Sequence, residues 1–330
     1  MSEGRLELVC PAGTPAALRS AVDAGADAVY LGLRDETNAR NFPGLNFTPD
    51  ELRGALQCAR PRGCRVFVAI NTFPAAGRPG PWHRAVDLAA ELGVDAVILA
   101  DIGLLDYAAR RHPALRRHLS VQASASNPEA IRFYHDAFGI RRVVLPRVLT
   151  LSEIAALNAA VPVETEVFAF GGMCVMAEGR CALSSYATGK SPNTCGVCSP
   201  ASHVRYEPRG DTTVVRLGDF TIDAFGPGVP AGYPTLCKGR FRAGGREGHL
   251  FEEPTSLNVA GLLPELAAAG VRALKIEGRQ RGRAYVARVV AAFRRAVDAA
   301  ARGEAVAPAD LSGLSEGGRA TSGAYREAWR

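Results

Sequence analysis

Short apolar runs alternate with helical patterns through the first 170 residues of the chain. The runs consist mainly of Val, Ile, Leu and Ala, and they predict seven strands, at 6–10, 27–33, 65–73, 95–101, 118–126, 141–148 and 161–170. The segments between them carry helix start and stop signals, and the first begins with Thr14 and Pro15 and ends at Gly25. Strands that are apolar on both faces are typical of a parallel sheet covered by helices, so the pattern favours an α/β fold.

An eighth apolar run, at 271–279, follows after an interruption of about 100 residues and leads into a long amphipathic segment, 283–303. Eight strand–helix units are the number that closes a parallel barrel. We therefore predict an α/β fold of the (β/α)8 barrel type, with a cysteine-containing insertion between strands seven and eight. The alternative is an open sheet followed by a second domain that carries the cysteines.

This reading divides the chain into three parts. Residues 1–170 hold the first seven βα units, 171–270 form the insertion that carries the cysteines, and 271–330 hold the closing strand, the long helix and a C-terminal tail. The insertion is rich in Gly, Pro and Cys, and VRYEPRG followed by TTVVRLG predicts a hairpin within it. The Ser- and Gly-rich tail after residue 303 is expected to pack loosely.

The composition is that of a soluble globular protein, with 47% hydrophobic and 22% charged residues in a chain of 330. It holds no apolar run long enough to span a membrane and no signal-peptide pattern at its start, so we expect a cytoplasmic protein. The formal charge is +6, and the basic residues are almost all arginine. We interpret this charge as a solvated basic surface and expect no nucleic-acid partner, although arginine suits carboxylate or phosphate ligands.

Polar side chains follow the ends of several predicted strands, where parallel barrels carry their functional sites. Together they predict a mouth that binds a polar, carboxylated ligand, with the two arginines holding carboxylates by paired hydrogen bonds. The substrate-binding candidates are Asn71, Gln122, Ser124, Asn127, Arg147, Glu277 and Arg279. The sequence contains no HExxH, GxSxG, GxGxxG or Walker A motif, and it identifies no catalytic residue.

Eight cysteines indicate the strongest candidate chemistry. Five of them fall between residues 174 and 237, and such clustering in a large cytosolic protein suggests a metal site more than disulfides. Only Cys195 and Cys198 form a close pair, so the spacing leaves three interpretations open: an iron–sulfur cluster, zinc or unmetallated thiols. We interpret Cys10, Cys58 and Cys64 as structural.

The segment EVFAFGGMCVMAEGRCALS, at 166–184, carries a recognisable pattern: Glu-x-Phe, a Gly turn, Cys, then Gly-x-Cys and Ser. It resembles the signature of the collagenase-like peptidase family, with Gly172 where that family usually has Ser or Ala. CPAGTPAALRSAVDAGADAVYLGL, YPTLCKGR, EEPTSLN and LKIEGRQR extend the resemblance over most of the chain. The match is closest to the UbiU-type branch, ubiquinone-biosynthesis proteins of an oxygen-independent pathway.

The resemblance implies a barrel-like core and a [4Fe–4S] cluster. Carried over residue by residue, the metal ligands are Cys174, Cys181, Cys198 and Cys237, and Cys195 is an additional thiol. It also implies a heterodimer with a homologous UbiV-like subunit that hydroxylates the aromatic ring of a ubiquinone precursor, with prephenate as oxygen donor. Related members hydroxylate RNA bases, so the alternatives are an RNA-base hydroxylase, a peptidase, which is the weakest, or a scaffold whose cluster only stabilises the fold.

Overall fold

A computed structural model describes residues 5–174, 176, 181–192, 197–229, 231–306 and 310–326. Eight parallel strands form a closed barrel, because β14 pairs with both β1 and β7. Their bounds are β1 Glu7–Pro11, β2 Ala28–Gly32, β3 Arg65–Ile70, β4 Ala96–Leu99, β5 Arg117–Leu119, β6 Arg142–Val144, β7 Glu164–Gly172 and β14 Ala273–Ile276. This confirms the predicted barrel and excludes the open sheet.

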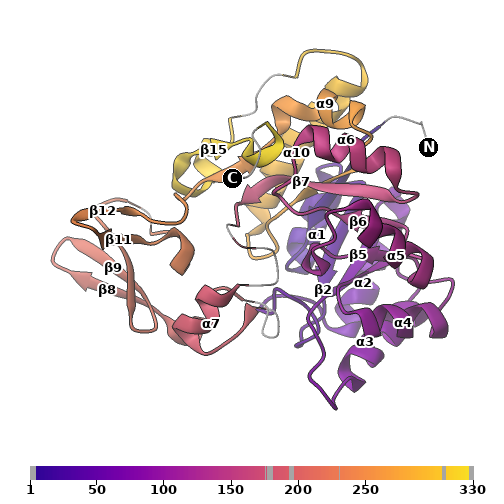
Figure 1. The fold of residues 1–330 in the computed structure, drawn as a ribbon, viewed down its shortest axis with the longest axis horizontal. Coiled ribbons are helices and arrows are strands. Elements are labelled where there is room, and N and C mark those ends of the chain that lie inside the picture. The colour runs from indigo at the N-terminus through magenta and orange to yellow at the C-terminus, as the bar shows by residue number, and fades with distance from the viewer. Residues whose placement is uncertain are drawn as a thin grey trace.

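Helices cover the outside of the barrel (Figure 1). They are α1 Pro15–Asp23, α2 Pro49–Ala59, α3 Gly80–Glu91, α4 Ile102–Arg111, α5 Pro128–Phe138, α6 Leu151–Ala160, α9 Leu263–Ala268 and α10 Arg283–Ala301. The first begins as its sequence predicts: the Thr14 side chain accepts a hydrogen bond from the Ala17 amide at 3.1 Å. The strand predicted at 118–126 ends earlier, at Leu119, because a 3-10 turn at Val121–Ala123 follows it. Within the described residues, no helix is both long and apolar enough to cross a membrane.

The inside of the barrel contains a buried network of charges. Arg142 is fully buried and pairs with Glu7 and Glu164, each at 2.6 Å, and with Glu166 at 3.3 Å. The Glu166 carboxylate also accepts a hydrogen bond from Lys275 at 2.6 Å. Burial raises the pKa of Glu166, but Lys275 and Arg142 outweigh it and hold the pKa below its ordinary value. These residues therefore fill the interior as neutralised ion pairs.

The predicted insertion leaves the barrel at the carboxyl end of β7 and forms an arm of two small antiparallel sheets. Figure 1 shows this arm extending away from the barrel. Its strands are β8 Val204–Arg209, β9 Thr212–Leu217, β10 Phe220–Phe225, β11 Arg240–Ala243 and β12 Arg246–His249. The predicted hairpin is confirmed as the β8–β9 pair. Because functional sites of parallel barrels lie at this end of the strands, the arm stands beside the expected mouth.

The chain returns to the barrel before residue 270. β13, Ser256–Asn258, pairs antiparallel with β7, and α9 then packs against the barrel before β14. Most described residues of the tail after residue 303 are exposed or half-buried, as expected, but β15, Ala320–Thr321, extends the sheet beside β13, and Leu311 and Tyr325 are buried. The Tyr325 hydroxyl donates to the Phe168 carbonyl at 2.8 Å, which anchors the tail to β7.

Candidate functional site: a thiol cluster at an arginine-lined mouth

The turn after β7 brings the chain close to the end of β14. Gly171 has φ +131°, and a Cβ there would lie 2.6 Å from the Cβ of Glu277. The next amide, of Gly172, donates to a Glu277 carboxylate oxygen at 3.2 Å. Only glycine accommodates this conformation and this approach together, and the turn directs the chain towards Cys174.

The four predicted cluster cysteines lie on segments at the root of the arm. Cys174 follows β7, Cys181 precedes α7 (Ala182–Thr188), and Cys237 lies in a 3-10 turn before β11. All four are half-buried thiols without a disulfide. Burial raises the pKa of Cys198 to about 11, Arg40 opposes this effect, and the charges of the other three thiols raise the pKa further. The four thiols are therefore close enough to interact electrostatically.

This arrangement bears on which metal group the thiols can hold. Within the described part of the chain, no group of three His, Cys, Asp or Glu side chains is placed so that it could hold a metal ion. The chemistry of the donors is nevertheless that of a soft-metal site, since thiolates on Gly- and Pro-containing loops suit an iron–sulfur cluster or zinc. Cys195, the additional thiol of the sequence, lies outside the described residues.

The other three cysteines lie in or beside the hydrophobic core. Cys10 and Cys64 are buried among the residues packed between strands and helices, and Cys58 packs against them from α2. Burial raises the pKa of Cys64 to about 12 and that of Cys10 well above its ordinary value. These thiols stay protonated at neutral pH, which agrees with the structural role we predict for them.

Three arginines, Arg40, Arg147 and Arg279, interact with Glu277 at the mouth of the barrel. Arg279 is buried, donates to the Asn38 side chain at 3.2 Å and lies 5.7 Å from the centre of the Tyr30 ring. Burial lowers its pKa to about 10, so it still carries its charge at neutral pH. Arg147 is buried over the ring of Phe168.

Sequence reasoning missed the third arginine, Arg40. It lies in the polar segment between β2 and α2, where no strand end or periodicity singles it out. Burial lowers the pKa of Arg40, but the charges of Cys198 and Glu277 outweigh burial and raise it, so the guanidinium interacts with both a thiol and the acidic group of the mouth. The only available signal was the resemblance to the family in DETNARNFPGLNF.

Glu277 is the acidic group of this mouth. Burial raises its pKa, but Arg40 and Arg147 outweigh burial and hold it below the ordinary value, so the side chain is a carboxylate. A second carboxylate, Glu252, interacts with Arg147. The three arginines Arg40, Arg147 and Arg279 still outnumber these two carboxylates, so the mouth suits an anionic ligand.

The remaining predicted residues divide into two groups. Gln122 and Ser124 each have a buried side-chain oxygen without a hydrogen-bond partner among the described residues, and such atoms suit a polar ligand. Asn71 instead holds the loop that carries Arg40, because its side-chain oxygen accepts from the Ala39 amide at 3.0 Å. Asn127 caps α5 by accepting from the Ala130 amide at 2.8 Å, which is a structural role.

A groove of about 800 Å³ runs between the arm and the C-terminal segment, and we call it the arm groove. Its walls come from β9 and β10, residues 229, 231–235 and 238, the start of α10 and residues 312–318. The Cys237 thiol lies 3.5 Å from the hydroxyl oxygen of Thr235, one of the lining residues, so the arm groove borders this thiol.

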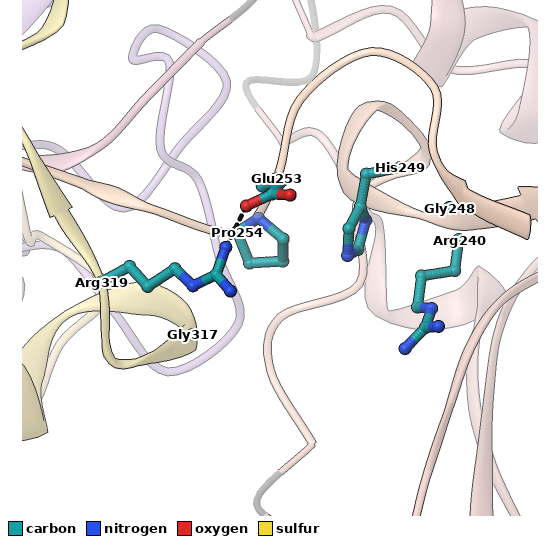
Figure 2. A pocket seen from close by; sticks show the side chains of 7 residues that line it. All are labelled: Arg240, Gly248, His249, Glu253, Pro254, Gly317 and Arg319. Atoms are coloured by element: carbon teal, nitrogen blue, oxygen red, sulfur yellow. Dashed lines mark hydrogen bonds and ion pairs between the residues drawn. The ribbon is translucent and has the colours of Figure 1, made fainter.

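A second hollow, of about 410 Å³, lies where the arm meets the tail (Figure 2). Arg319 pairs with Glu253 across it, and a ring nitrogen of His249 lies 3.0 Å from the Lys238 carbonyl oxygen. The first contact joins the tail to the end of the arm and the second is internal to the arm, so we assign this hollow a structural role.

The comparisons with known proteins agree with this architecture. The family model described as peptidase family U32 matches residues 13–322. A solved U32 peptidase superposes with a TM-score of 0.50 at 15% identity, covering 84% of this chain and 95% of its own, which supports the fold.

Similar characterised sequences carry three kinds of name. The tRNA hydroxylation protein P of Escherichia coli (strain K12) is 32% identical over 90% of this chain and 69% of its own length. The 23S rRNA 5-hydroxycytidine C2501 synthase of the same organism is 31% identical over 91% of this chain and 40% of its own, and a collagenase of Porphyromonas gingivalis is 27% identical over 92% and 68%. The chain thus spans about two thirds of the tRNA hydroxylation protein and under half of the rRNA synthase. On its fold, its signature turn and these matches, the chain belongs to peptidase family U32.

Proposed function

We propose that this chain is the iron–sulfur subunit of a system that hydroxylates the aromatic ring of a ubiquinone precursor without molecular oxygen. The observation that carries the proposal is the placement of four free thiols at the root of the arm, one of them two residues after the turn that Glu277 holds at the arginine-lined mouth. The names of the RNA-hydroxylating relatives support ring hydroxylation as the reaction class. The resemblance to the UbiU-type branch supports the quinone substrate.

A [4Fe–4S] cluster held by Cys174, Cys181, Cys198 and Cys237 would supply electron transfer next to this mouth. The protein's own groups then bind and orient the reactants. Arg147 and Arg279 hold the two carboxylates of prephenate, the proposed oxygen donor, since a guanidinium pairs with a carboxylate through two parallel hydrogen bonds. Their burial keeps water from competing for these contacts.

Glu277 and Arg40 are positioning residues of the mouth and do not take part in the reaction itself. The Glu277 carboxylate fixes the turn that leads to Cys174 and balances the charge of Arg40 and Arg147. Arg40 offsets the negative charge that four thiolates bring together. A homologous UbiV-like subunit completes the system as a heterodimer, and co-purification under anoxia tests this partner.

A second candidate function is hydroxylation of an RNA base, which the names of the relatives favour. A deletion strain grown without oxygen distinguishes the two. We expect an unhydroxylated ubiquinone precursor to accumulate and the plasmid-borne gene to restore the quinone, with modified RNA nucleosides unchanged. Loss of a hydroxylated nucleoside with normal quinone would assign the chain to RNA instead.

The cluster itself is tested on the purified protein. Anaerobic purification, with and without the partner, should give about four irons and four sulfides per chain. A folded sample that contains zinc or no metal would refute the redox function and leave a structural thiol site.

A further inference from the structure

We propose that the arm groove binds an apolar chain attached to the ring of the substrate. The inference rests on the proposed function, because it takes the thiols and the arginine-lined mouth as the place of hydroxylation. It adds a site for the long hydrocarbon substituent that the ring of such a precursor carries.

The groove borders the thiols and the mouth through two of its lining residues. The Cys237 thiol lies 3.5 Å from the hydroxyl oxygen of Thr235, and Thr235 lines the groove. Tyr285, a second lining residue, donates its hydroxyl to the carbonyl oxygen of Glu277 at 3.3 Å. A ring bound next to Cys237 can therefore extend a substituent into the groove.

The lining favours hydrocarbon. Val215, Ile222 and Phe225 contribute from the arm, Val229 from the connecting segment and Leu314 from the C-terminal segment. Val229 remains 56% exposed, so it leaves apolar surface for a ligand to cover. The volume of about 800 Å³ lies within the range of small-molecule sites, about 300–1,000 Å³.

The charges in the wall disfavour an RNA strand. Glu316 pairs with Lys238 and lies 3.8 Å from Arg281, so both cations of the wall are matched by a carboxylate. Asp223 adds a second carboxylate to the lining. A phosphodiester backbone needs cations that are available to it, whereas a neutral chain does not. The groove therefore fits an isoprenoid-like substituent better than a polynucleotide.

The test compares two phenols on the anaerobically purified full chain by calorimetry: phenol with a geranyl substituent, and phenol itself. We expect the geranyl compound to bind at least about tenfold more tightly, since each buried methylene adds to affinity. Val229→Asp and Phe225→Ala should each weaken geranylphenol binding about tenfold. Leu250→Asp is the matched control, because Leu250 is 53% exposed next to β12 and outside the groove, and it should bind as the unmodified chain does.

Equal binding of the two phenols, or equal effects of Val229→Asp and Leu250→Asp, would overturn the assignment. Displacement of geranylphenol by a single-stranded oligoribonucleotide would also overturn the assignment, and it would identify the groove as an RNA-binding site. Iron and sulfide content, measured on the same samples, reports the proposed function separately. A full cluster with no preference for the geranyl chain refutes only the groove, whereas absence of the cluster refutes the proposed function.

Discussion

The guanidinium carbon of Arg147 lies 3.4 Å from the centre of the Phe168 ring, so the arginine stacks on the aromatic face. Arg147 follows β6 and Phe168 belongs to β7, the neighbouring strand. Stacking sets the plane of the guanidinium and thus the direction of the N–H donors along its edge.

Arg147→Lys should weaken prephenate binding about tenfold, because an ammonium can neither stack in this way nor pair with a carboxylate through two fixed donors. Iron content should not change, since Arg147 is not among the thiol ligands. Calorimetric titration of the anaerobic protein with prephenate measures the effect. Unchanged affinity would remove Arg147 from the donor site.

Alanine substitution of a cluster cysteine should abolish the bound iron. We expect Cys174→Ala and Cys237→Ala to lose the cluster and anaerobic quinone synthesis, because a four-iron cluster needs all four thiolates. Cys58→Ala is the matched control, a half-buried thiol on α2 that should keep a full complement of iron. Full iron and activity in Cys174→Ala would refute the ligand assignment.

Cys195→Ala decides the role of the additional thiol. If Cys198 is the fourth ligand, as the resemblance implies, this variant should retain about four irons per chain. If Cys195→Ala loses its iron and Cys198→Ala retains it, the fourth ligand is Cys195 and Cys198 is the additional thiol. Iron and sulfide assays on both variants give the answer.

The two glycines after β7 should differ in their tolerance of alanine. Gly171→Ala should destabilise the protein by about 1–3 kcal/mol, because it combines a left-handed φ with a 2.6 Å approach to the Glu277 Cβ. At Gly172 the nearest atom to a Cβ is a carboxylate oxygen of Glu316, at 2.9 Å, which can move aside, and the Glu277 oxygen at 3.7 Å is at ordinary contact distance. Gly172→Ala should therefore change the free energy of unfolding by less than about 0.5 kcal/mol. Urea denaturation of the two variants is the measurement, and equal losses would contradict this account of the turn.

Arg142→Met should be among the most destabilising single changes. It removes the buried cation that Glu7, Glu164 and Glu166 share and leaves each of them with one partner, Arg65, Arg116 and Lys275 respectively. Breaking a buried ion pair costs about 3–5 kcal/mol. Arg53→Met removes an exposed ion pair with Asp50 and should cost at most about 1 kcal/mol. The denaturation midpoints of the two variants are compared. A small loss of stability in Arg142→Met would show that protonation or bound water compensates the negative charge of the carboxylates.

His118 should make the fold sensitive to mild acid. It is fully buried, and burial, followed by the charges of Arg142 and Arg116, holds its pKa well below the ordinary value. The imidazole is therefore neutral in the folded state, while in the unfolded state it binds a proton near pH 6.5. Its contribution to stability is complete above that pH and is lost as the pH falls towards the folded-state pKa, by up to about 1.4 kcal/mol per pH unit.

His118→Gln removes this titration and keeps an acceptor for Arg116, whose Nε lies 3.0 Å from the imidazole. The variant should therefore lose less stability than the unmodified chain between about pH 6.5 and 5, above the range in which carboxylates protonate. Urea denaturation at several pH values measures both slopes. Identical slopes would mean that His118 takes up its proton in the folded state.

Local patterns in the sequence determined the architecture. Eight apolar runs predicted eight strands, and Thr14 before Pro15 predicted the first helix start, because these signals act between residues that are neighbours along the chain. Cysteine clustering and the signature turn at Gly171 likewise indicated where chemistry would lie. Closure of the barrel followed from the number of strands.

Only the tertiary structure decided which polar side chains meet. Arg40 joins the mouth from a loop without periodicity, whereas Asn127, which follows a predicted strand, is used as a helix cap. The arm groove unites β10 with residues 312–318, nearly 90 positions further along the chain. Such convergence depends on the pairing of β14 with β7 and on contacts between distant segments, and these interactions leave no local periodicity in the sequence.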